Sequence, residues 1–241
     1  MKAILYIGHG TRSKEGAAEA HSFIHRVMER INVEIQEISF LELTKPSIEE
    51  GFLSCVERGA TEITVVPLFL LAAGHIKTDI PQALSTLCKR YPNINVNIRD
   101  PFGVQGKILD GIAEMVRKTV DLSPQDSILI VGRGSSDKSI HTAFATITSG
   151  ISERLGIDHV EVCFLAAAEP RLQEGLESIS ENAVGKIIVI PYLLFSGLLL
   201  KEVDEMVKKR QKLGQRIIHT GQLSKHRVIE DIIIQRATEG E

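Results

Sequence analysis

Residues 4–14 read ILYIGHGTRSK, and 124 positions later residues 128–138 read ILIVGRGSSDK. Each stretch is an apolar run that ends in a glycine-bearing turn and continues into a polar segment. This order is typical of a buried strand that leads into a helix in an α/β protein. The stretch therefore predicts an α/β fold, and its recurrence indicates that the fold occurs twice in the chain.

The offset of 124 persists beyond this stretch without a gap. Further identical pairs are Phe40 and Phe164, Pro46 and Pro170, Gly51 and Gly175, and Pro67 and Pro191. One residue is then lost, so that His75 aligns with Leu198. A repeat of this length exceeds the solenoid unit of about 20 to 50 residues. We therefore predict two domains from an internal duplication, at residues 1–122 and 123–241.

Each half alternates strands with helices. In the first half we predict strands at residues 3–7, 33–40, 62–69 and 95–99, and helices at residues 15–30, 48–58, 81–90 and 104–120. Strands that are apolar on both faces, such as residues 63–66, indicate a parallel sheet covered by helices on both sides. In a doubly wound sheet of the flavodoxin type, the first strand lies between the second and third, and ligands bind beyond their carboxyl ends.

Composition excludes several classes of protein. A net charge of -3 and a pI near 6.3 argue against a general nucleic-acid binder. The apolar run at residues 63–74 is too short to span a membrane, and residues 1–7 do not resemble a signal peptide, so we expect a cytoplasmic protein. Cys55, Cys88 and Cys163 follow no metal or disulfide spacing and are expected to be buried packing residues.

Three polar residues are expected at the carboxyl edge of the first sheet. His9 follows the first predicted strand, Glu42 the second, and His75 the third. Two imidazoles and a carboxylate can bind a divalent metal ion and leave coordination positions open, and a neutral imidazole can also accept a proton. Both roles remain open from the residues alone. Glu42 could instead cap the following helix.

A local basic patch is also expected near this edge. Arg12, Lys45 and Lys77 follow the three candidate residues and could bind an anionic ligand, although each could equally be a solvated surface charge. The turn at residues 8–11 matches neither nucleotide-binding glycine motif, so a nucleotide-driven reaction is not predicted.

Residues 8–12, GHGTR, resemble the HG[ST]R motif of the class II tetrapyrrole chelatases, and residues 74–81, GHIKTDIP, resemble their GHxxxDIP motif. The resemblance runs along the whole chain and extends to the related cobaltochelatase of the anaerobic cobalamin route. It implies two chelatase-type domains in one chain.

The resemblance implies insertion of Fe2+ into sirohydrochlorin without ATP. His9 and His75 would handle the metal ion and the protons, with Glu42 as a weaker metal ligand. No cofactor would be bound permanently, because Fe2+ or Co2+ is itself a substrate. The residues expected to contact the macrocycle are Thr11, Arg12, Leu43, Thr44, Lys45 and Arg133. The alternatives are a cobaltochelatase with the same substrate and a carrier of metal or tetrapyrrole without turnover.

The second half is expected to lack the chemistry of the first. The alignment pairs His9 with Arg133, and it pairs Glu42 with Ala166. A guanidinium cannot accept a proton at neutral pH but binds carboxylates with two hydrogen bonds. We therefore expect one active centre, in the first half of a monomeric chain, and a second half that forms the other wall of the cleft. Arg133 could instead pair with an acidic residue between the halves.

Overall fold

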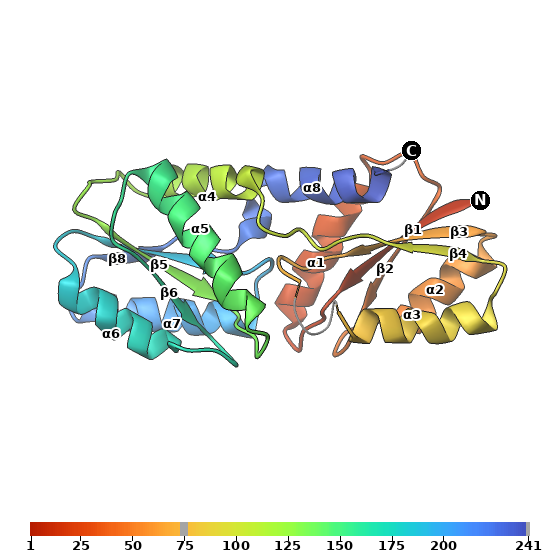
Figure 1. Cartoon of the computed structure of the whole chain (residues 1–241), viewed down its shortest axis with the longest axis horizontal. Coiled ribbons are helices and arrows are strands. Elements are labelled where there is room, and N and C mark those ends of the chain that lie inside the picture. The colour runs from red at the N-terminus through yellow and green to blue at the C-terminus, as the bar shows by residue number, and fades with distance from the viewer. Residues whose placement is uncertain (73–76, 240–241) are drawn as a thin grey trace. The chain divides into compact units, whose positions relative to one another are not determined.

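The computed structural model describes residues 1–72 and 77–239, which form two four-stranded parallel sheets (Figure 1). The strand orders are β2-β1-β3-β4 and β6-β5-β7-β8. In each sheet the first strand of the half lies between the second and third, as expected for a doubly wound sheet of the flavodoxin type. The predicted duplicated α/β fold is confirmed.

The order of elements is the same in both halves. The first half contains β1 (Lys2–Gly8), α1 (Lys14–Met28), β2 (Ile35–Phe40), α2 (Ile48–Glu57), β3 (Glu62–Pro67), α3 (Asp79–Arg90), β4 (Asn95–Ile98) and α4 (Gly106–Thr119). The second contains β5 (Ser127–Gly132), α5 (Ser139–Leu155), β6 (Val160–Phe164), α6 (Leu172–Asn182), β7 (Ile187–Tyr192), α7 (Leu198–Lys212), β8 (Ile217–His219), a 3-10 turn (Leu223–Lys225) and α8 (Arg227–Thr238). Within the described ranges, no helix is both long and apolar enough to cross a lipid bilayer.

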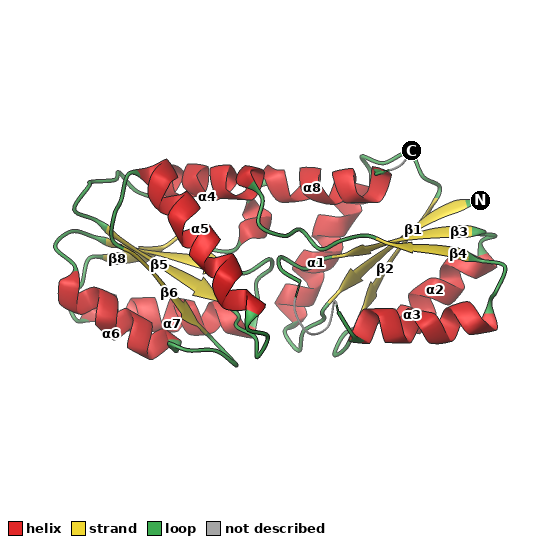
Figure 2. Ribbon diagram, viewed as in Figure 1, coloured by secondary structure: helices red, strands yellow, loops and turns green. Residues whose placement is uncertain are grey.

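Both faces of each sheet are buried. In β1, Leu5 and Ile7 belong to one core cluster with Phe52 of α2 and Leu84 of α3. The intervening Tyr6 is also fully buried, and strand alternation directs it to the opposite face. Around the second sheet, Figure 2 shows α6 and α7 along one face and α5, with α4 of the first half, along the other. This double cover explains why the strands are apolar on both sides.

The compact units differ from the two sequence halves at their last helices. One unit comprises Met1–Gly103 with Ile229–Glu241, and the other comprises Val104–Val228. Helix α4 therefore belongs with the second sheet, where Leu109 packs so closely on α5 that a Cβ at Gly150 would lie 2.5 Å from its Cδ1. An amphipathic pattern predicts that a helix is buried but does not identify the sheet on which it packs.

Helix α8 makes the reciprocal exchange and belongs with the first sheet. Its Glu230 accepts hydrogen bonds from Arg26 and Arg30 of α1 at 3.0 and 3.1 Å, and Arg30 also binds Asp231. The boundary predicted at residue 122 follows the sequence repeat, whereas the compact units exchange α4 and α8.

Helix α2 begins with a complete capping box. Ser47 is the N-cap, and its hydroxyl accepts a hydrogen bond from the Glu50 backbone N–H. The Glu50 carboxylate accepts in return from the Ser47 N–H at 2.6 Å and from Lys45 Nζ at 2.9 Å. These bonds, the backbone one foremost, lower the pKa of Glu50 from its ordinary 4.5 to about 2.

We expect Glu50→Gln to remove part of the acid sensitivity of folding. The folded-state pKa lies below the unfolded one, so ionised Glu50 stabilises the fold fully above about pH 4.5 and progressively less down to about pH 2. Wild-type Tm should therefore fall across this window by more than the Tm of the variant. Parallel Tm curves for the two proteins would contradict this account of the cap.

Two of the three cysteines are buried, as expected. Burial raises the pKa of the Cys55 and Cys163 thiols to about 12, so both remain protonated. Cys88 is half-buried on α3, which corrects the expectation that all three are buried. All three are free thiols.

Candidate metal and tetrapyrrole site

His9 and Glu42 are brought together by the backbone beyond the ends of β1 and β2. The Leu41 N–H donates to the Gly8 carbonyl at 2.9 Å, and the Glu42 N–H donates to the His9 carbonyl at 3.1 Å. Hydrogen bonding between the strands thus continues past the last strand residues. The prediction that these two loops meet at the carboxyl edge of the sheet is confirmed.

Gly10 allows the two loops to approach so closely. Its φ is +93°, and a Cβ at this position would lie 1.7 Å from the Glu42 carbonyl oxygen. No other residue type fits this position, because both the backbone conformation and the space require glycine. The glycine turn therefore serves the packing of the two loops that carry the candidate residues.

The His9 ring is oriented toward the Glu42 carboxylate. The distance from Nε2 to Oε1 is 3.6 Å, and the side chains are 24% and 49% exposed. His9 Nδ1 lies 3.3 Å from the Gly10 carbonyl, and the ring of Phe69 lies 6.1 Å away. When Nδ1–H donates to that carbonyl, Nε2 carries the lone pair that a metal ion or a proton requires.

The separation of these atoms suits a shared metal ion. Two donor atoms that each lie about 2.1 Å from one divalent ion are about 3.0 to 3.4 Å apart. The 3.6 Å between His9 and Glu42 is close to this range. Across residues 1–72 and 77–239, no group of three His, Cys, Asp or Glu side chains is arranged to hold a metal ion. The third candidate ligand, His75, lies outside the described residues.

The structure removes the alternative role of Glu42 as a helix cap. Ser47 caps α2, and Glu50 completes its capping box. Glu42 is instead exposed on the loop between β2 and α2. The carboxylate is therefore available for a ligand at the edge of the sheet.

The residues predicted to contact the macrocycle differ in their surroundings. Arg12 is exposed, and Leu43 is 53% exposed with a φ of +63°. Lys45 is 78% exposed, but its ammonium pairs with Glu50 at 2.9 Å. Thr11 and Thr44 are half-buried and hydrogen-bonded to each other. Sequence reasoning did not find this pairing, or the proximity of Phe69 to His9.

The second half retains the same loop frame without the candidate ligands. The Ala166 N–H donates to the Arg133 carbonyl at 2.8 Å, which reproduces the bond between Glu42 and His9. A Cβ at Gly134, where φ is +88°, would lie 1.8 Å from the Ala166 carbonyl oxygen. Arg133 is exposed on this frame. Leu198, which the alignment pairs with His75, follows the end of β7 and is 61% exposed.

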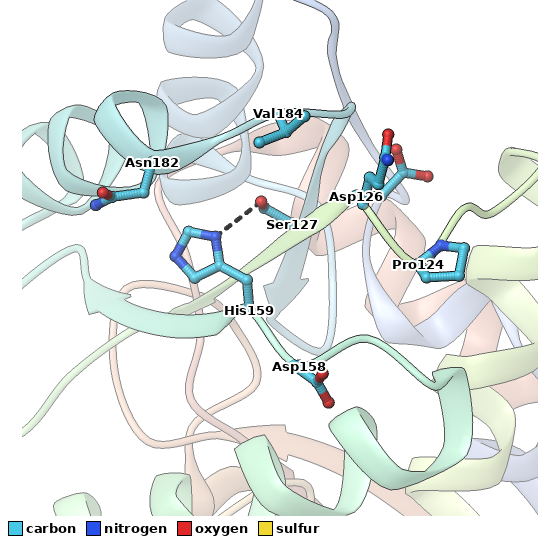
Figure 3. A pocket seen from close by; sticks show the side chains of 8 residues that line it. Pro124, Asp126, Ser127, Asp158, His159, Asn182 and Val184 are labelled. Atoms are coloured by element: carbon cyan, nitrogen blue, oxygen red, sulfur yellow. Dashed lines mark hydrogen bonds between the residues drawn. The ribbon is translucent and has the colours of Figure 1, made fainter.

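A hollow of about 530 Å³ lies at the opposite, amino-terminal edge of the second sheet (Figure 3). His159 Nδ1 lies 2.9 Å from Ser127 Oγ, and Nε2 lies 2.8 Å from Glu161. In Figure 3 the Asp126, Asp158 and Asn182 side chains point in different directions and do not converge on the hollow. The His159 ring is therefore held between Ser127 and Glu161.

The fold and this edge define the class of protein: a duplicated, doubly wound α/β chain with a histidine and a carboxylate at the switch point of one half. The chain belongs to the CbiX family, whose profile matches residues 3–119 and again residues 127–240. The family resemblance expected from the motifs is thereby confirmed.

Relatives with assigned names match over nearly the whole chain. The sirohydrochlorin ferrochelatase of Priestia megaterium is 41% identical over 227 residues, which cover 94% of this chain and 85% of the relative. The sirohydrochlorin cobaltochelatase of the same organism is 31% identical over 247 residues, covering 100% and 80%. The solved structure of SirB from Bacillus subtilis with Fe3+ superposes with a TM-score of 0.88 at 32% identity, covering 99% of this chain and 94% of that one.

Proposed function

We propose that this protein inserts Fe2+ into sirohydrochlorin to give siroheme, without ATP. The observation that carries the proposal is the His9–Glu42 pair, held 3.6 Å apart at the switch point of a CbiX-family domain. The names of relatives that match nearly all of the chain support the same substrate. Residues 1–122 would carry the active centre.

His9 has the chemistry that metal insertion requires. The reaction must remove water from the metal ion and protons from the inner nitrogens of the macrocycle. The Nε2 lone pair of His9 can bind the ion or accept such a proton, and the Glu42 carboxylate can neutralise the resulting positive charge. In this proposal His75 shares the work of His9, and Glu42 is a weaker metal ligand.

The macrocycle itself is flat, apolar on its faces and rich in carboxylates at its rim. Leu43 presents an exposed apolar side chain directly after Glu42, and Arg12 is exposed two residues beyond Gly10. We assign Leu43 to a face of the macrocycle, and Arg12 and Arg133 to its carboxylates. Lys45 would contribute only by exchanging its bond to Glu50 for a substrate carboxylate.

Cobaltochelatase activity on the same substrate is the second candidate, and a relative bearing that name covers the whole chain. Imidazole and carboxylate ligands do not by themselves select Fe2+ over Co2+. A carrier that binds without turnover is the third.

The proposal also places one active centre in each monomer. It places the protein in the cytoplasm, where free thiols such as those described above persist.

Anaerobic assays with purified protein, sirohydrochlorin and either Fe2+ or Co2+ test the proposal. The metallated tetrapyrrole, which is siroheme with Fe2+ and cobalt-sirohydrochlorin with Co2+, should form in many-fold excess over protein. Its formation should have a higher kcat/KM with Fe2+ than with Co2+. The reverse preference would make the chain a cobaltochelatase. Product limited to the protein concentration, or binding with no product, would make it a carrier.

We expect Arg133→Ala to raise KM for sirohydrochlorin about tenfold or more, because a charge-assisted hydrogen bond is lost, and to lower kcat less. Steady-state kinetics with the tetrapyrrole as the varied substrate measure both constants. Arg133→Lys should recover part of the affinity. Arg216→Ala, which removes another exposed arginine of the second half, should leave KM unchanged. A loss of kcat with KM untouched would overturn the assignment.

A further inference from the structure

Thr44 joins the two loops that carry His9 and Glu42. Its hydroxyl accepts a hydrogen bond from the Thr11 N–H at 2.9 Å and donates one to the Thr11 carbonyl at 3.0 Å. Thr11 lies two residues after His9, and Thr44 lies two residues after Glu42. The single hydroxyl proton of Thr44 is therefore engaged within the protein.

The bonds around Thr44 form a continuous chain. The Thr44 N–H donates to the Glu42 carbonyl at 2.7 Å. On the other side, Thr11 Oγ1 accepts from the Ser13 N–H at 3.0 Å, and Ser13 caps α1. The exposed loop with Glu42 is thereby tied to the start of a packed helix.

The second half offers an internal comparison. Thr44 corresponds to Ala168, and Thr11 corresponds to Ser135. The backbone bond between the loops persists there, and Ser135 Oγ still accepts from the Asp137 N–H at 3.1 Å. Alanine at position 168 has no hydroxyl, yet the loop frame forms. The hydroxyl is thus absent from the half that also lacks the histidine and the glutamate.

We propose that Thr44 is a positioning residue, which holds the Glu42 carboxylate at the distance from His9 that a shared metal ion requires. The inference rests on the proposed function and deepens its metal site. Leu43, between the two residues, has a left-handed φ of +63°, and its counterpart Ala167 has one of +53° although Ala168 carries no hydroxyl, so the backbone turn itself does not depend on Thr44. What the Thr44 hydroxyl adds is a direct side-chain link between the loop with Glu42 and the loop with His9. A metal ligand that moves by about 1 Å loses its productive geometry.

The test compares Thr44→Ala with Thr44→Ser. Alanine matches the natural residue of the second half, which folds, and serine restores the hydroxyl. Co2+ is titrated into each protein without tetrapyrrole and followed by its visible absorbance, which reports the ligands directly. Thr44→Ala should weaken Co2+ binding about 10- to 100-fold, as loss of groups that orient metal ligands does. Thr44→Ser should bind within about threefold of wild type, because it keeps both hydrogen bonds.

Kinetics provide the second readout. Thr44→Ala should raise KM for the metal and lower kcat. KM for sirohydrochlorin should stay unchanged, in contrast to the contact with the macrocycle that the sequence predicted for Thr44. Thr148→Ala is the matched control, because within the described ranges it removes a hydroxyl whose one hydrogen bond is to the Phe144 carbonyl of α5. This control should match wild type in Co2+ binding. Thermal unfolding of each variant measures any general loss of stability.

Two results would overturn the proposal. A Thr44→Ala protein that binds Co2+ like wild type but has a raised KM for sirohydrochlorin would make Thr44 a substrate-binding residue. Equal losses in Thr44→Ser and Thr44→Ala would show that the hydroxyl is not the cause. His9→Ala distinguishes a failure of the proposed metal site from a failure of the role of Thr44. If His9→Ala binds Co2+ like wild type, the proposed metal site is wrong as well. If His9→Ala loses Co2+ affinity and Thr44→Ala does not, only the role of Thr44 is overturned.

Discussion

Replacing His9 by alanine is expected to lower the rate of metal insertion about 10²- to 10⁴-fold, the range for removal of a residue that transfers protons in catalysis. His9 lies on a loop beyond β1, and its Nε2 faces Glu42 at 3.6 Å. The substitution removes both a metal ligand and a proton acceptor, and it leaves the sheet intact. Turnover is measured as siroheme formation, and folding by circular dichroism and Tm.

His75→Ala is expected to have an effect of the same order, because the motif that contains it resembles the second chelatase motif. Glu42→Gln should be milder, since the amide keeps an oxygen that can bind a metal ion but loses the charge. His25→Ala, on the exposed face of α1, is the control and should retain full activity. Near-normal turnover by His9→Ala, with an unchanged circular dichroism spectrum, would refute the assignment.

The meeting of His9 with Glu42 could be predicted because it depends only on topology. Once the repeat indicated a doubly wound sheet, the strand order placed the ends of β1 and β2 side by side, and residues just after those ends had to lie close. The prediction needed no knowledge of rotamers. The second half was predicted to lack the candidate ligands for another reason, because the repeat aligns His9 with Arg133 and Glu42 with Ala166.

Other features depend on side-chain geometry that a linear pattern does not contain. The Thr44 hydroxyl reaches Thr11 across 33 positions, and threonine in a loop carries no signal of such a bond. Lys45 was predicted to bind substrate from its charge and position, and its ion pair with Glu50 of the capping box could not be predicted from the sequence. The packing of α4 and α8 was also not predictable, because an apolar helix face fits either sheet.

Gly10→Ala is expected to destabilise the protein by about 3 kcal/mol or more, since it combines backbone strain with a severe overlap. At a φ of +93° an L-residue is strained, and the new Cβ would lie 1.7 Å from the Glu42 carbonyl oxygen. The overlap can be relieved only if the loop with Glu42 moves away from His9. The variant should therefore lose Co2+ affinity as well as stability.

Gly134→Ala is the matched control within the same chain. Its φ of +88° and its Cβ distance of 1.8 Å from the Ala166 oxygen nearly equal the values at Gly10. The two variants should lose similar free energies of unfolding in urea, because the strain is the same. Only Gly10→Ala should lose Co2+ affinity when measured on folded protein below the unfolding transition, because the loop displaced in Gly134→Ala carries an alanine instead of a ligand. Equal loss of Co2+ affinity in both variants would show that general destabilisation, and not the displacement of Glu42, weakens the site.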